Sequence, residues 1–117
     1  MALENLQNIV PVASKISRKA KSSVEVRTSI EKSLENLKMN TMSFCFIHSV
    51  PTETYEKYLP VLVKAIQDGL AQKLGYSGDE AYLQDAIEMD KFSCIMATLN
   101  ILDQKIKILY TKLVKEI

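Results

Sequence analysis

The apolar residues of the C-terminal segment recur three and four residues apart, with no Gly or Pro among them. This spacing is typical of one face of a helix and predicts a long helix over about residues 91 to 116. At about 1.5 Å per residue, such a helix is roughly 39 Å long. Further apolar residues widen this seam, so we expect the helix to pack against more than one partner helix. The predicted packing or interface seam consists of Phe92, Ile95, Leu99, Leu102, Ile106, Leu109 and Leu113.

Similar spacing predicts two helices in the middle of the chain. Ser22 and Glu25 have the pattern of a capping box, and the apolar residues that come after them predict a helix over about residues 23 to 39. A second apolar face begins after Pro51, and Gly75 is expected to end its helix because glycine readily adopts the left-handed terminating conformation.

Shorter elements are predicted on either side of these helices. The N-terminal residues predict a short helix that ends or kinks near Pro11, and residues 14 to 23 predict a loop or an exposed helical turn. Residues 75 to 79 predict a turn, with another helix from about Asp79.

The apolar stretch from residue 42 to residue 50 is ambiguous between a buried strand and the buried end of a helix. A single strand would leave its backbone groups without partners, and the rest of the sequence predicts helices. We therefore favour a helix here and leave the strand open.

Together these elements predict one all-α domain over residues 1–117, an antiparallel helical bundle of four to five helices with a long C-terminal helix. We find no internal repeat or linker. The composition, with 47% hydrophobic and 25% charged residues, is typical of a globular chain and excludes a disordered one.

The net charge is only +1, but basic residues gather near the N-terminus. Such a cluster can contact phosphates, although no aromatic residue is interleaved to stack on a base. A solvated basic loop is the alternative. The predicted polyanion-binding residues are Lys15, Arg18, Lys19, Lys21 and Arg27.

Cysteine usage and hydropathy predict a cytoplasmic protein without a membrane segment. Cys45 and Cys94 both lie in apolar surroundings, as small buried hydrophobes do, and no secretory signal is evident. No stretch approaches the roughly 20 apolar residues of a membrane span.

Chemical motifs are weak. The three glycines match no phosphate-binding loop, and Cys and His lack the paired spacing of a zinc site, so we predict no cofactor and no metal. On a helix, Cys45 and His48 would share a face and could form a nucleophile and its base, but two structural residues are the simpler interpretation.

With no catalytic residue identified, the sequence predicts a non-catalytic protein-interaction module that forms a homo-oligomer through apolar helix faces. The alternative is a nucleic-acid-associated protein or a small subunit of a nucleoprotein complex, which would contact phosphates through the basic segment. An enzyme that uses Cys45 and His48 ranks third.

Overall fold

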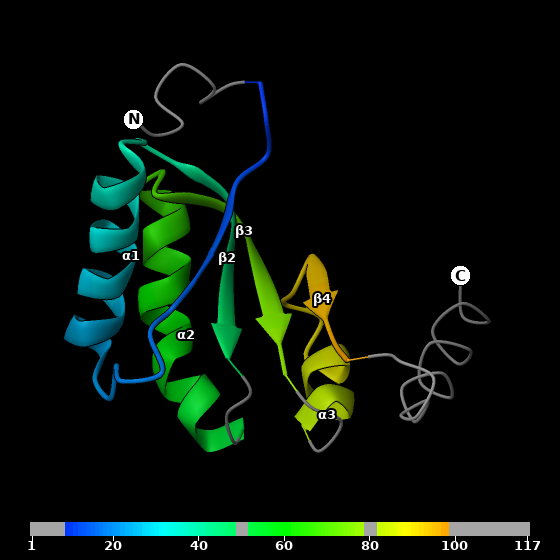
Figure 1. Ribbon diagram of the computed structural model, residues 1–117. Helices are drawn as coiled ribbons and strands as arrows, with labels where there is room; N and C mark the ends of the chain where they lie inside the picture. Colours follow the sequence, from blue (N-terminus) through cyan, green and yellow to red (C-terminus); the bar gives the residue numbers. More distant parts are fainter. Residues whose placement is uncertain (1–8, 49–51, 79–81, 99–117) are drawn as a thin grey trace.

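A parallel β-sheet lies at the centre of the computed structural model, which describes residues 9–48, 52–78 and 82–98 (Figure 1). Strands and helices alternate along the chain. The elements are β1 (Ala13–Lys15), α1 (Ser23–Leu37), β2 (Met42–His48), α2 (Thr52–Gln67), β3 (Ala71–Ser77), α3 (Leu83–Glu88) and β4 (Cys94–Met96).

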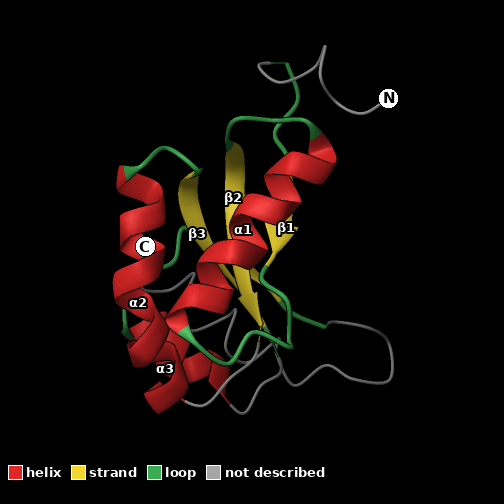
Figure 2. Cartoon of the chain, turned by 90° about the vertical axis from the view of Figure 1, so that its left-hand side faces the viewer, coloured by secondary structure: helices red, strands yellow, loops and turns green. Residues whose placement is uncertain are grey.

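The strands are arranged in the order in which they occur in the chain, β1-β2-β3-β4, and every neighbouring pair is parallel. Helices α1 and α2 lie on the same face of this sheet (Figure 2). Sequential parallel strands with helices on one face form an arc of a (β/α)8 barrel, whereas a doubly wound sheet reverses its strand order. The predicted all-α antiparallel bundle is therefore wrong.

Side chains alternate between the two faces of each strand, and one set packs against the helices. The buried residues on the helix side include Cys45 and Ile47 of β2 and Leu74 and Tyr76 of β3. The helices contribute Val26, Ile30, Leu34, Leu62 and Ala65 to the same core. The opposite face of the sheet carries Lys15, Phe46, His48, Gly75 and Ser77, which alternate with the core residues.

Helix α1 confirms the prediction made for residues 23 to 39. The Ser22 hydroxyl accepts a hydrogen bond from the Glu25 backbone N–H at 3.2 Å, and the Glu25 carboxylate accepts one from the Lys21 N–H at 2.6 Å. At the other end, Lys38 adopts a left-handed conformation with φ of 53°. The Met39 N–H then bonds to the Leu34 carbonyl at 3.0 Å, which satisfies a terminal acceptor.

Helix α2 is shorter than predicted. Gly69, with φ of +76°, stops it just after Gln67, so the predicted end at Gly75 is wrong. Leu70 and Leu74 continue the three- and four-residue spacing of the apolar residues in α2, but both lie beyond the end of this helix, and Leu74 belongs to β3. The helix runs through Pro60.

Residues 42–48 form a strand, so the preference for a helix there is also wrong. The argument that a strand would lack partners fails because β1 and β3 pair with it on both sides. Part of the predicted loop over residues 14 to 23 is β1.

The long C-terminal helix is contradicted where it can be compared. Residues 94–96 form β4, and the chain from 99 onward lies outside the described residues. The predicted helix from Asp79 corresponds to the short α3, although residues 79–81 are not described. Residues 1–8, which contain most of the predicted N-terminal helix, also lie outside the described residues.

None of the helices in the described part of the chain combines the length and apolarity needed to cross a membrane.

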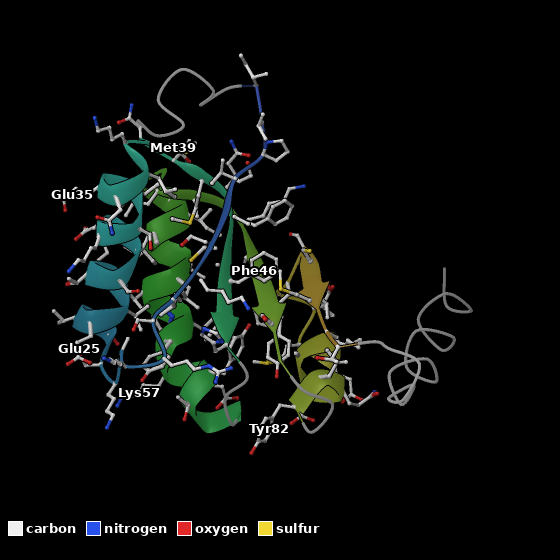
Figure 3. All side chains as sticks on the ribbon, in the orientation of Figure 1. Glu25, Glu35, Met39, Phe46, Lys57 and Tyr82 are labelled. Atoms are coloured by element: carbon white, nitrogen blue, oxygen red, sulfur yellow. The ribbon has the colours of Figure 1, made fainter. Side chains whose placement is uncertain are left out.

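Gly75 allows close packing between two strands. A Cβ atom at this position would lie 2.5 Å from Cε1 of Phe46, its register partner on β2. Figure 3 shows the Phe46 side chain beside β3, away from α1. The absence of a side chain at Gly75 is what lets the buried ring lie over the neighbouring strand.

We expect Gly75→Ala to lower the free energy of unfolding by about 1–3 kcal/mol, because the added methyl group overpacks the Phe46 ring. Urea unfolding measures this change. In a Phe46→Leu background the same substitution should cost less, since the ring is gone. An equal cost in both backgrounds would contradict the proposed contact.

Candidate functional site

Three polar side chains lie at the carboxyl ends of three neighbouring strands. Lys15 is the last residue of β1, His48 of β2 and Ser77 of β3, and His48 and Ser77 are register partners. Because the strands are parallel, these ends meet at one edge of the sheet. Sites in barrels of this type are built at that edge.

The three side chains also share one face. The Ser14 hydroxyl donates to the Ser33 hydroxyl of α1 at 3.1 Å, so Ser14 faces the helices and Lys15 faces the other side. Ile47 and Tyr76 are core residues, which places His48 and Ser77 on the same side as Lys15.

His48 has a defined hydrogen-bond partner. Nε of Arg18 donates to Nδ1 of His48 at 3.2 Å. An Nδ1 atom that accepts this bond carries no proton, so the proton of the neutral ring is on Nε2. Partial burial lowers the pKa of His48 below its ordinary value, and the nearby positive charges of Arg18 and Lys15 lower it further. The ring therefore stays neutral and can donate through Nε2.

The loop that carries Arg18, residues 16–21, is attached to the sheet and to both long helices, and we call it the Arg18 loop. The Ile16 N–H bonds to the Phe46 carbonyl at 2.9 Å. The Ser17 N–H bonds to the Ser29 hydroxyl of α1 at 2.8 Å. The Tyr58 hydroxyl of α2 donates to the Ala20 carbonyl at 3.3 Å. These bonds fix the backbone on both sides of Arg18.

This arrangement can stabilise negative charge on an oxygen atom. A lysine ammonium group and a neutral imidazole N–H are both hydrogen-bond donors, and they come from adjacent strands. Donors placed by a rigid scaffold where negative charge develops are among the strongest contributions to catalysis.

The structure divides the predicted polyanion-binding residues. Lys15 lies at the strand edge and Arg18 contacts His48, whereas Lys19 and Lys21 are exposed on the Arg18 loop. Arg27 lies on α1, where it forms ion pairs with Glu31 at 2.7 Å and Asp68 at 2.6 Å. The five residues thus have separate environments, and polyanion binding by them stays a prediction.

The Cys45–His48 pair has the wrong geometry for a nucleophile and its base. On a strand, residues three apart face opposite sides, so Cys45 lies in the core while His48 faces away from it. Burial raises the pKa of the Cys45 thiol to about 12, which keeps it protonated. Among the described residues, no group of His, Cys, Asp and Glu could hold a metal ion.

Two residues of the predicted seam can be placed. The centroid of the Phe92 ring lies 4.9 Å from that of Tyr55 and 5.5 Å from that of Tyr76. Phe92 therefore packs against the hydrophobic core of its own chain. Ile95, in β4, is 37% exposed. The other five seam residues, Leu99, Leu102, Ile106, Leu109 and Leu113, lie outside the described residues.

Sequence reasoning selected Lys15 and His48 but never brought them together. The sequence places Lys15 in a basic cluster, predicts a helix that pairs His48 with Cys45, and predicts a turn that contains Ser77. The available signal was position, since each of the three residues closes a short strand that precedes a helix in the chain.

Comparisons with known proteins agree with this geometry. The sequence matches the family model described as the aldo/keto reductase family over residues 4–115. A comparison with curated proteins finds no match.

Solved structures share the fold at low identity. An aldo-keto reductase from Bacillus halodurans in its holo form has a TM-score of 0.82 and 14% identity, over 97% of this chain and 40% of that one. The aldose reductase from Schistosoma japonicum has a TM-score of 0.72 and 19% identity, over 96% and 46%. An aldo-keto reductase complexed with NADPH has a TM-score of 0.73 and 13% identity, over 92% and 36%. This chain therefore spans less than half the length of each of these proteins.

The family match overturns two predictions. The non-catalytic interaction module and the prediction that the chain is not an enzyme are wrong, because the matched family is one of oxidoreductases. The family match gives no support to the alternative of a nucleic-acid-associated protein or a subunit of a nucleoprotein complex. A homo-oligomer stays a prediction.

We expect Cys45 to react with a mild thiol reagent far more slowly than Cys94 in the folded protein, because Cys45 is buried and protonated while Cys94 is partly exposed. Mass spectrometry of the labelled peptides measures the two rates, and unfolding in urea should equalise them. Equal labelling of both thiols without denaturant would contradict the buried position of Cys45.

Proposed function

This chain belongs to the aldo/keto reductase family, and from that premise we propose that it supplies the Lys15 and His48 part of a site that reduces the carbonyl group of an aldehyde or ketone. The observation that carries the proposal is the position of these two residues, at the carboxyl ends of adjacent parallel strands and on one face. Because the chain covers less than half of its solved relatives, we propose for it a part of such a site.

The residues have distinct roles in this proposal. Reduction adds a hydride to the carbonyl carbon and a proton to the carbonyl oxygen, and negative charge develops on that oxygen as the hydride arrives. His48 donates a hydrogen bond from Nε2 to that oxygen, since its Nδ1 accepts from Arg18. The ammonium group of Lys15 stabilises the same developing charge from the neighbouring strand.

The hydride requires a cofactor, and one structurally similar aldo-keto reductase is complexed with NADPH. A nicotinamide cofactor, when bound, supplies the hydride. At the carboxyl edge, Ser77 is the register partner of His48, and its hydroxyl group is of a kind that hydrogen-bonds the amide group of a nicotinamide. The described residues thus fit the reacting end of such a cofactor.

The glycines of this chain do not form a comparable binding site for the phosphate groups of such a cofactor. Gly75 is packed against Phe46, Gly69 precedes β3 at the opposite edge, and the Gly78 N–H bonds to the Met96 carbonyl at 3.2 Å. None of them forms a glycine-rich phosphate loop. The proposal therefore assigns only the reacting end of the cofactor to the described residues.

A cytoplasmic setting is part of the same proposal. Both cysteines are free thiols, as expected in a reducing compartment.

The test is aldehyde-dependent oxidation of NADPH by the full chain, followed by absorbance. We expect His48→Gln and Lys15→Met each to reduce the rate about a hundredfold or more, since each removes a group that stabilises the oxyanion. Lys19→Met is the matched control, because it removes a positive charge from the neighbouring loop without touching the site. A wild-type chain without aldehyde-dependent oxidation, or an unchanged rate in His48→Gln, would overturn the proposal.

A further inference from the structure

The contact between Arg18 and His48 joins an exposed loop residue to the carboxyl end of β2. Arg18 is exposed on the Arg18 loop, and its Nε reaches across to β2 to donate to Nδ1 of the ring. If the basic residues of this loop were only solvated, Arg18 would not be expected to contact His48. We therefore look for the role of this contact in the candidate site.

We propose that Arg18 is a positioning residue for His48, which holds the ring neutral and orients it with the proton on Nε2. This inference rests on the proposed carbonyl-reducing function, because that function needs a donor at His48. A neutral imidazole has one donor and one acceptor nitrogen, and a neighbouring donor at Nδ1 decides which is which. A guanidinium group suits this task because it always carries its protons and never accepts.

The Arg18 loop is built to keep this contact in place. Three of its hydrogen bonds, to Phe46 in β2, Ser29 in α1 and Tyr58 in α2, join it to three different elements. The turn closes on itself as well, since the Ala20 N–H bonds to the Ser17 carbonyl at 3.0 Å. Because the backbone is already held in this way, only the side-chain entropy of Arg18 is lost when its contact with His48 forms.

Two positive charges act on the His48 ring, and they come from different segments. Arg18 lies on the loop after β1 and Lys15 is the last residue of β1. On the other side, the register partner in β3 is Ser77, which carries no charge. Both cations oppose protonation of the ring, but Arg18 alone also contacts Nδ1. Removing Arg18 should therefore change both the pKa of the ring and its tautomer, whereas removal of a distant charge should change neither.

His48 is the single histidine of the chain, so its ring can be observed by NMR without an assignment problem. Long-range proton–nitrogen spectra of the nitrogen-15-labelled full chain report both the tautomer and the pKa. In the wild type we expect the Nε2–H tautomer and a pKa below the ordinary 6.5. Arg18→Met should raise the pKa and introduce the Nδ1–H tautomer. Lys19→Met, the matched control from the same loop, should leave both unchanged.

A conservative variant separates charge from hydrogen bonding. Arg18→Lys keeps a positive charge but lacks the planar guanidinium fork, so we expect it to restore more of the pKa shift than of the tautomer preference. An Nδ1–H tautomer in the wild type, or equal effects of Arg18→Met and Lys19→Met, would overturn the proposal.

The rate of aldehyde-dependent NADPH oxidation distinguishes the two proposals. If both hold, the acidic limb of the pH profile moves to higher pH in Arg18→Met, because the ring protonates earlier. Oxidation that needs His48 but is accompanied by unchanged NMR parameters in Arg18→Met would refute the role of Arg18 alone. The expected NMR changes in a chain without oxidation would refute the proposed function, and with it the purpose assigned to the contact.

Discussion

The parallel pairing of β2 with β3 is the constraint on which the rest of the structure depends. Two consecutive strands can run parallel only if the chain crosses back between them, and α2 makes this crossing. The helix must then bury its apolar face on the sheet, which creates the core around Leu62, Leu74 and Tyr76. The same pairing brings His48 and Ser77 to one edge. The hydrophobic core and the candidate site therefore both result from the parallel pairing of β2 with β3.

Local features of the fold could be predicted from the sequence, and the pairing could not. Helix α1 was correct because its start depends on two nearby residues, Ser22 and Glu25, and its buried face on regular spacing. For residues 42–48 the sequence favours a helix over the strand because a strand buried on both faces lacks alternation, and its partners lie far away in the sequence. The structure shows that β1, β2 and β3 begin at the equally spaced residues 13, 42 and 71, a spacing that is visible only once the strands are known.

The candidate site shows the same division. Lys15 and His48 have ionisable side chains, so both could be identified as candidates from the sequence. Their proximity depends on the register of β1 with β2, which is a tertiary property. The type of secondary structure matters as well. Cys45 and His48 are three residues apart, a separation that puts two side chains on the same face of a helix but on opposite faces of a strand. An error in secondary structure therefore became an error in chemistry.

The sequential order of the strands also bears on how the protein comes to be folded. Each of β2, β3 and β4 pairs with the strand before it, so among the described strands none of these three must wait for a later part of the chain. Loop closure between neighbours is then the main entropic barrier at each step, and it is similar for the first two crossings because they have similar length. A chain emerging from the ribosome could add one strand and one helix at a time, each new strand pairing with the unpaired backbone groups at the edge of the last.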